Sequence, residues 1–390
     1  MKSKFKILLT GGGTGGHIQP ILAVVSELRK IGDERQVDFD FLHIGSVPKK
    51  EKNIIEAADI EYDHVLTGKV RRYFSLQNLV DIFKIPIGIL QAYFKVRKFK
   101  PDVVFGKGGF ASVPAVVAAG WLNIPVIIHE SDTSAGLANR KLAKYATVIA
   151  LGFARARSCF PDNKVVVTGN PVRPEILTGK KDQALNEFNF DGTKPIIFIT
   201  GGSLGAQTIN RVTVGALKKL LEKYDIIHQC GDVNLKDTLG RVKLIFGDNR
   251  LKKQGVNYYL KGAGYRLRPY LKNEMADAYA AADLVVSRAG ASNITEIAAL
   301  SKPSILIPLP MSASRGEQIG NAGLFAKAKA AKVILNQDFT AESFLTAVEE
   351  LFGSPDKLAS MGRSAHKFYE PQAAVKLAEE IFNLARYGRD

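Results

Sequence analysis

A glycine-rich turn followed by a histidine is the first segment of the chain whose residue types suggest chemistry. After the apolar run at 7–9, Gly11, Gly13 and Gly16 fit the pattern G-x-G-x-x-G, and His17 follows directly. Glycines let backbone N–H groups approach an anion closely, and the N-terminus of a following helix adds partial positive charge. We therefore expect the turn to bind a phosphate group. His17 could act as a general base near neutral pH or as a polar capping residue.

Two common nucleotide-binding motifs fit this turn poorly. A dinucleotide-binding fold requires an acidic residue at the end of its second strand, and the segment FLHIGS at 41–46 has none. A P-loop requires Lys and then Ser or Thr after its last glycine, where this chain has His17 and Ile18. These departures disfavour both NAD and a P-loop nucleotide as the ligand.

A second candidate phosphate site lies in the segment VVSRAGASNITEIAAL at 285–300. Residues 290–293 could present backbone N–H groups to a phosphate at a helix N-terminus. Glu296 has two explanations: it completes a capping box opened by Asn293, or its carboxylate accepts hydrogen bonds from a ribose diol. Arg288 could bind phosphate as a bidentate fork or form a surface ion pair.

A polar loop after the apolar strand near 304–310 carries further side chains that could contact sugar hydroxyls. These are Glu317, Gln318 and Asn321. The alternative is an ordinary loop and helix start.

Strand-like runs alternate with helical patterns such as 20–32, which predicts parallel sheets covered by helices on both faces. The candidate strands are 6–11, 37–45, 102–108, 126–130, 147–152, 164–170, 195–203, 224–231, 283–290 and 304–310. Two prolines, Pro171 and Pro174, interrupt the alternation and mark a domain boundary. Each half opens on a strand followed by Thr-Gly-Gly, which suggests two similar domains at 1–170 and 171–370. A last helix at 371–390 could pack on either.

Composition narrows the class of partner. The 390 residues carry a formal net charge of +16, which suggests nucleic acid, an acidic membrane surface or a phosphorylated substrate as partner. No nucleic-acid-binding motif accompanies the charge. We expect no transmembrane helix. Cys159 and Cys230 have no metal-ligand spacing, and the Asp-x-Asp pair at 38–40 falls inside a strand, so we expect neither a metal nor a cofactor.

The segment at 69–100 is basic and aromatic. It holds eight Lys or Arg residues, one acid and six Tyr or Phe residues. Cations around apolar side chains suit an anionic lipid surface. The same composition also fits a core helix whose lysines reach solvent.

Several motifs, in this order along most of the chain, resemble the MurG family of glycosyltransferase family 28. They are GGGTGGHIQP (11–20), KGGFASVPAV (107–116), IPVIIHESD (124–132), AGLANRKLA (135–143), TGNPVR (168–173), TGGSLGAQTIN (200–210), SRAGASNITEIAA (287–299) and EQIGNA (317–322). The resemblance implies an α/β fold with two Rossmann-like domains facing across a cleft, the glycosyltransferase B fold.

The resemblance also implies an activity. Members of this family move N-acetylglucosamine from UDP-N-acetylglucosamine, with inversion, to the C4 hydroxyl of MurNAc in undecaprenyl-linked lipid I. The product is lipid II for peptidoglycan synthesis. The expected location is the cytoplasmic face of a bacterial cell membrane, as a peripheral protein, with cell-wall synthesis or division proteins as candidate partners. No cofactor or metal is implied.

Site residues follow from the same resemblance. The first domain would bind acceptor and membrane, with Thr14, Gly15 and Gly16 facing the diphosphate and acceptor, and with His17 and Asp132 as catalytic candidates. The second domain would bind the donor through Arg173, Ser203, Leu271, Arg288, Ala291, Ser292, Asn293, Ile294, Thr295, Glu296, Glu317 and Gln318.

Two positions depart from some family members. Where this chain has Asp132, others carry Asn, which could not act as a base, whereas a carboxylate could do so or orient His17. Others carry Gln-Gln in place of Glu317-Gln318, which leaves the role of Glu317 open.

Three alternatives to this activity stay open. A diacylglycerol glycosyltransferase or a UDP-N-acetylglucosamine 2-epimerase would use the same fold. A non-catalytic membrane partner that binds a UDP-sugar would show no turnover.

Overall fold

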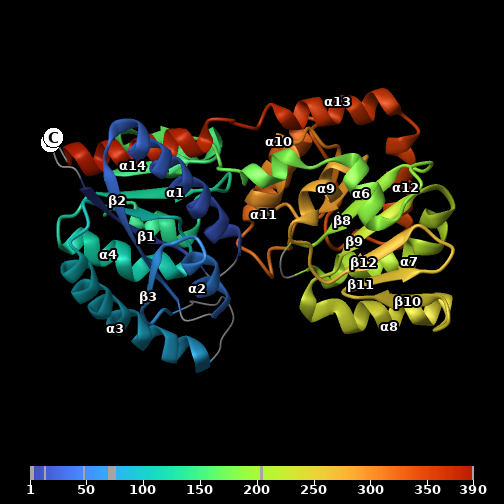
Figure 1. Cartoon of the computed structure of the whole chain (residues 1–390), viewed down its shortest axis with the longest axis horizontal. Helices are drawn as coiled ribbons and strands as arrows, with labels where there is room; N and C mark the ends of the chain where they lie inside the picture. The colour runs from blue at the N-terminus through green and yellow to red at the C-terminus, as the bar shows by residue number, and fades with distance from the viewer. Residues whose placement is uncertain (1–3, 13–14, 47–48, 69–75, 203–204, 389–390) are drawn as a thin grey trace. The chain divides into compact units, whose positions relative to one another are not determined.

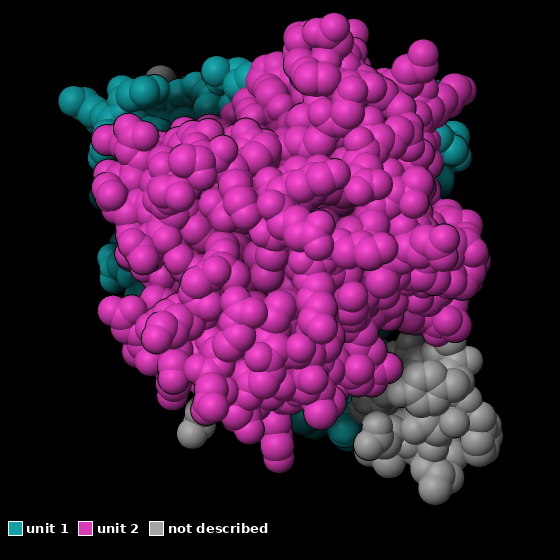
Figure 2. Space-filling model, turned by 90° about the vertical axis from the view of Figure 1, so that its right-hand side faces the viewer, with its two compact units in different colours: residues 1–172, 370–390 teal, residues 173–369 magenta. Residues whose placement is uncertain are grey.

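The computed structural model describes residues 4–12, 15–46, 49–68, 76–202 and 205–388, with the backbone alone at 15–17, 49–50 and 76–82. The chain forms two compact units (Figure 2), the first made of Met1–Val172 and Glu370–Asp390 and the second of Arg173–Tyr369. The two expected prolines flank this division. The C-terminal helix, whose packing the sequence left open, belongs to the first unit.

The first unit is built on a parallel sheet with the strand order β3-β2-β1-β4-β5-β6-β7. The strands are β1 (Lys4–Thr10), β2 (Asp38–Gly45), β3 (Glu61–His64), β4 (Val103–Gly106), β5 (Val126–Glu130), β6 (Val148–Leu151) and β7 (Val165–Val167). Every residue of β4 and β5 is buried, as apolar runs in a doubly covered sheet must be. Because the strands are parallel, their carboxyl ends share one edge, where ligands bind in such sheets.

Helices cover both faces of this sheet (Figure 1). They are α1 (Gly15–Arg35), α2 (Lys49–Glu56), α3 (Leu76–Phe99), α4 (Val113–Trp121), α5 (Leu137–Leu142) and α14 (Ala373–Tyr387), with short 3-10 turns at Phe110–Ser112, Ala154–Cys159 and Asp162–Lys164. Alternate side chains of β1 face opposite layers: Ile7 and Leu9 pack with α1 and α14, and Leu8 packs with α3 and α4. This alternation follows from the two-residue period of a strand.

The last helix, α14, completes the core of the first unit. Leu377, Ile381 and Phe382 are buried beside α1 and the sheet. The Phe382 ring lies edge-on to Phe5, with ring centroids 5.4 Å apart. The chain therefore passes through the second unit and returns to close the first.

The second unit has a mixed sheet with the order β10-β11-β12-β9-β8-β13-β14-β15, antiparallel only at β10–β11 and β11–β12. The strands are β8 (Ile196–Thr200), β9 (Asp225–Gln229), β10 (Leu251–Gln254), β11 (Asn257–Leu260), β12 (Tyr265–Arg268), β13 (Leu284–Ser287), β14 (Ser304–Leu306) and β15 (Lys332–Val333). Its helices are α6 (Lys181–Phe188), α7 (Gln207–Lys223), α8 (Leu235–Phe246), α9 (Glu274–Ala281), α10 (Ala291–Ala299), α11 (Glu317–Lys327), α12 (Ala341–Phe352) and α13 (Pro355–His366), with 3-10 turns at Pro174–Thr178 and Asp232–Asn234.

Two layers enclose this second sheet. Ile197 and Ile199 of β8 pack with α7 and α12 on one face. Phe198 points to the other face and meets Tyr279 of α9, with ring centroids 5.1 Å apart. The register pairs Thr200 with Ser287, so the ends of β8 and β13 lie together at the carboxyl edge.

The fold confirms the predicted pair of Rossmann-like α/β domains, and each of the ten expected strand segments contains a strand. The helix expected at 20–32 begins earlier, at Gly15. His17 therefore lies in the first turn of α1 rather than just before the helix, which corrects that expectation. Within the described ranges, no helix combines the length and apolar character needed to span a bilayer.

Candidate functional site

An ion pair at the carboxyl edge of the second sheet joins two of the predicted donor residues. Arg173 donates from Nε and Nη2 to Oε1 of Glu296, at 3.2 and 2.8 Å. The hydroxyl of Tyr279 donates a hydrogen bond to Oε2 of the same carboxylate, at 3.2 Å. Burial alone would lower the pKa of Arg173, but the Glu296 carboxylate raises it above the ordinary value. Arg173 and Glu296 are thus held as a charged pair.

The start of α10 bears on the capping-box explanation of Glu296. The N-cap of α10 is Gly290, and Asn293 lies three residues inside the helix without capping it. Asn293 donates instead to Oγ of Ser287, at 2.9 Å. The capping-box interpretation is therefore wrong, because the glycine preceding the helix takes the position that the pattern gave to Asn293.

In the first turn of α10, a ligand would meet mainly backbone groups, because several of the side chains are turned inward. Ile294 is fully buried, and Thr295 turns its hydroxyl back to the carbonyl of Ala291, at 2.7 Å. Asn321 of α11 is buried and donates to the carbonyl of Ala289, so it supports the turn and does not reach outward to a sugar. The unpaired N–H groups of a helix N-terminus suit a phosphate.

Two predicted residues begin α11, directly after the loop that follows β14. Gln318 accepts a hydrogen bond from the backbone of Leu309, at 3.0 Å, and a Cβ built at Gly290 would lie 3.7 Å from its Nε2. Glu317 opens α11 and accepts a hydrogen bond from the backbone of Arg315, at 2.7 Å. Gln318 thus lies beside the start of α10, whereas Glu317 shapes its own loop.

Arg288 does not form the surface ion pair considered for it, and its role toward phosphate stays a prediction. Its side chain is buried, and Nη1 donates to the carbonyl of Ile307 and to Oδ1 of Asn336, at 3.1 and 2.8 Å. Burial lowers the pKa of this guanidinium to about 10. A surface ion pair is therefore excluded, and the observed contacts connect β13 to the end of β14.

Gln229 makes hydrogen bonds beside Leu271, the predicted donor residue whose backbone the family resemblance places at uracil. Gln229 at the end of β9 donates to Oγ1 of Thr200, at 3.0 Å, and accepts from the backbone N–H of Leu271, at 2.8 Å. Leu271 is buried, and its amide N–H is already engaged. A nucleobase bound beside Leu271 would contact the carbonyl of Leu271 or displace the side chain of Gln229.

The carboxyl edge of the first sheet holds a buried charged cluster. Lys107, directly after β4, is 2 % exposed and donates to Oγ of Ser131 in the loop after β5. Burial lowers the pKa of its ammonium to about 8, although the carboxylates of Glu130 and Asp132 oppose that shift. The predicted catalytic candidate Asp132 therefore lies near a cationic side chain for which the sequence predicted no role.

Glu130 is a second buried residue that sequence reasoning missed. Its Oε1 accepts from the backbone of Asp132 at 3.0 Å, and its Oε2 accepts from the backbone of Gly136 at 2.9 Å and from Asn139 at 3.0 Å. These bonds fix the loop that carries Asp132. In the sequence, Glu130 ends an otherwise apolar strand and lies in the motif IPVIIHESD (124–132), of which only Asp132 was predicted to act.

The glycine turn of the first unit also has an acidic neighbour. A Cβ built at Gly12 would lie 2.8 Å from Oε2 of Glu51, which is buried at the start of α2 and accepts from Ser46. Of the predicted residues here, Thr14 lies outside the described residues, and so does Ser203 in the second unit. Gly15, Gly16 and His17 are placed by backbone alone, in α1.

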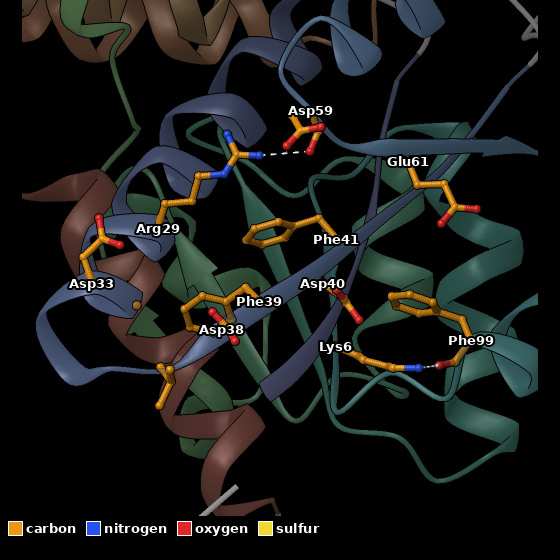
Figure 3. A pocket seen from close by; sticks show the side chains of 12 residues that line it. Lys6, Arg29, Asp33, Asp38, Phe39, Asp40, Phe41, Asp59, Glu61 and Phe99 are labelled. Atoms are coloured by element: carbon orange, nitrogen blue, oxygen red, sulfur yellow. Dashed lines mark hydrogen bonds between the residues drawn. The ribbon is translucent and has the colours of Figure 1, made fainter. Parts of the chain in front are cut away.

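A cavity of about 720 Å³ in the first unit lies away from these residues (Figure 3). It opens at the amino-terminal half of β1 and β2, between Lys6, Arg29 and a set of acidic side chains. Arg29 already donates to the carbonyl of Asp59, and Lys6 to that of Phe99. The edge of the sheet where such folds bind their ligands is the opposite one.

Both halves of the chain match one family. Residues 7–151 match the glycosyltransferase family 28 N-terminal domain, and residues 196–377 match the family's C-terminal domain. A curated relative from Bacillus thuringiensis is 43% identical over 89% of this chain and 91% of its own length. A relative from Bacillus cereus is 41% identical over 95% of this chain and 97% of its own. Both are named UDP-N-acetylglucosamine--N-acetylmuramyl-(pentapeptide) pyrophosphoryl-undecaprenol N-acetylglucosamine transferase.

Solved structures with a similar fold cover almost the whole chain. MurG from Acinetobacter baumannii shares 27% identity and superposes with a TM-score of 0.69, covering 97% of this chain and 99% of its own. A UDP-GlcNAc 2-epimerase from Neisseria meningitidis, at 16% identity and a TM-score of 0.66 over 98% of this chain, shares the fold alone. The chain therefore belongs to glycosyltransferase family 28, and within it to the MurG-type N-acetylglucosamine transferases.

Proposed function

We propose that this glycosyltransferase moves N-acetylglucosamine from UDP-N-acetylglucosamine to the C4 hydroxyl of MurNAc in undecaprenyl-linked lipid I, forming lipid II. The observation that carries the proposal is identity of 41–43% to transferases named for this donor and acceptor, over 89–95% of the chain. The matches cover most of the chain and therefore extend into both units.

On the donor side, the second unit would hold UDP. The carboxylate of Glu296 is the acceptor for a ribose diol, and Arg173 beside it offers a cation to the diphosphate. Backbone N–H groups of residues 290–293 add partial positive charge at the start of α10. As UDP leaves, negative charge grows on the diphosphate, and these preorganised groups stabilise it.

On the acceptor side, the first unit would hold the MurNAc hydroxyl. His17 or Asp132 takes the hydroxyl proton as general base. The oxygen then attacks the anomeric carbon on the face opposite UDP, the bond from that carbon to the diphosphate oxygen breaks, and the electron pair leaves with UDP. The anomeric configuration is thereby inverted.

A lipid-linked acceptor requires access to a membrane, and α3 offers it. Its side chains Phe83, Ile87, Leu90 and Phe94 are all exposed, with Phe83 71 % and Phe94 61 % accessible. Their spacing of four, three and four residues puts them on one helix face. The opposite face is buried at Ala92 and Val96. The buried face fits the core-helix explanation of this segment, and the exposed apolar face supports the lipid-surface explanation.

The charge of α3 favours an anionic lipid surface. Arg97 and Lys98 are exposed and follow Phe94 by three and four residues, so they continue the apolar face with cations. Basic residues flanking an exposed apolar face suit anionic headgroups. We infer a peripheral position on the cytoplasmic face of a bacterial membrane.

The proposal is tested by acceptor screening in detergent with UDP-N-acetylglucosamine as donor. Mass spectrometry should find that lipid I gains one N-acetylhexosamine, whereas diacylglycerol gains none. Epimerisation of the donor without any acceptor would indicate the epimerase alternative. Binding of UDP without turnover on lipid I would leave a non-catalytic partner and contradict the proposal.

A further inference from the structure

A buried lysine connects the two segments that carry the acceptor-side catalytic candidates. Lys107 follows β4, and its backbone N–H donates to the carbonyl of Thr10 at 2.8 Å. A Cβ built at Gly11 would lie 2.9 Å from the Cβ of Lys107, so the glycine turn that leads to His17 rests against this residue. The Lys107 ammonium then reaches Oγ of Ser131, the neighbour of Asp132.

The loop that carries Asp132 is held at several points besides Lys107. Asn170 donates to the carbonyl of Ser131 at 2.9 Å, and Glu130 accepts from the backbone of Asp132. Lys107 adds a full positive charge inside the protein. A buried charge costs free energy unless nearby opposite charge compensates it.

The charged neighbours of Lys107 give it a role beyond packing. In the described part of the chain, these are the carboxylates of Glu130 and Asp132, together with His129. Burial and the Lys107 charge both lower the pKa of His129 well below its ordinary value, so His129 stays neutral. The positive charge of Lys107 is therefore balanced by the two carboxylates.

We propose that Lys107 is a positioning residue of the acceptor site, which holds the Asp132 loop against the glycine turn and places a positive charge beside the Asp132 carboxylate. An ammonium near a carboxylate favours its charged form, and a charged carboxylate can accept a proton or orient His17. The inference rests on the proposed function, because it assigns Lys107 to the acceptor half of that reaction.

The sign of the pH dependence follows from the charge. The Lys107 ammonium has a pKa of about 8 and is protonated below that pH. Above it, the ammonium loses its proton and the cation beside Asp132 disappears. The value of kcat/KM should therefore fall as pH rises through about 8. A base with a histidine-like pKa would set the opposite, acidic limb of the profile.

The test compares pH–rate profiles of the wild-type enzyme, Lys107→Met and Lys107→Arg with lipid I. Loss of the positioning charge should lower kcat by about 10- to 100-fold in Lys107→Met, because small misplacements of reacting groups have effects of that size. The alkaline limb should vanish in Lys107→Met. Lys107→Arg should restore much of the rate and stay active at higher pH, because a guanidinium keeps its charge.

The control is Lys164→Met in the same unit. Lys164 donates to the carbonyls of Ala143 and Ala146 just before β7, at the amino edge of the sheet. This variant should keep the wild-type profile. In each variant, the fluorescence of Trp121, the single tryptophan, reports whether the first unit is folded.

Three results would overturn the inference. They are a wild-type rate and alkaline limb in folded Lys107→Met, a folded Lys107→Arg no faster than Lys107→Met, or an unchanged kcat with only the KM for UDP-N-acetylglucosamine altered. Absence of lipid II with the wild-type enzyme would instead overturn the proposed function, and this inference with it.

Discussion

Both carboxylate oxygens of Glu296, a proposed donor residue, accept hydrogen bonds, one from Arg173 and the other from Tyr279. A ribose diol would replace or share these bonds. Since removal of one partner leaves the other partly buried and without its ion pair, binding is sensitive to changes at this position.

We predict that Glu296→Ala weakens binding of UDP by about 10-fold or more, since hydrogen bonds to a charged group contribute about 1.5–3 kcal/mol. Tyr279→Phe should have a smaller effect, because the Arg173 pair remains. Isothermal titration with UDP measures both. The control is Glu349→Gln, an exposed position on α12 in the same unit. Equal affinity of Glu296→Ala and wild type would remove Glu296 from the donor site.

The structure places the backbone of His17 in the first turn of α1. Its role is therefore tested by kinetics. We predict that His17→Ala lowers kcat by about 100-fold, the effect typical of losing a general base. Affinity for UDP should change little, because the donor residues belong to the second unit. Single-turnover kinetics and UDP titration separate the two quantities. An unchanged kcat would make His17 a structural residue.

At the scale of elements, α3 combines a core face with an exposed apolar face. We predict that Phe94→Ser lowers affinity for vesicles containing anionic lipid by about 10-fold, as expected when one large apolar side chain no longer leaves water. Binding should also weaken with added salt, because Arg97 and Lys98 of α3 are exposed. Vesicle co-sedimentation measures this.

The matched control for α3 is Leu244→Ser on α8, which is 88 % exposed and lies in the second unit. It should bind vesicles as the wild type does. If Phe94→Ser and Leu244→Ser bound equally well, α3 would not be the membrane-contacting element.

Most elements could be predicted from sequence because buried parallel strands are continuous apolar runs. The strand β3 has the sequence EYDH, and the β10–β11 hairpin contains LKKQ, so neither has that signal. Arg288 could not be placed either, since its partners Ile307 and Asn336 are distant in sequence. The Lys107 cluster was missed for the same reason: it assembles only when β4 and β5 lie side by side.

At the scale of the whole molecule, the return of α14 ties the end of the chain to the first unit. We predict that Phe382→Ala destabilises that unit by about 3–5 kcal/mol, the usual cost of removing a buried phenylalanine. Urea unfolding followed by Trp121 fluorescence should show a lower midpoint. Tyr387→Ala, an exposed position on the same helix, should leave the midpoint unchanged. An unchanged midpoint for Phe382→Ala would contradict this packing.

In the proposed reaction, cleavage of UDP-N-acetylglucosamine is coupled to glycosylation of lipid I in the same enzyme. The most direct measurement incubates the purified protein with UDP-N-acetylglucosamine and lipid I in detergent and quantifies both products. We predict that UDP and the disaccharide lipid appear in equal amounts, and that omission of lipid I abolishes UDP release. Release of UDP without the disaccharide lipid, or no reaction with lipid I, would contradict the account.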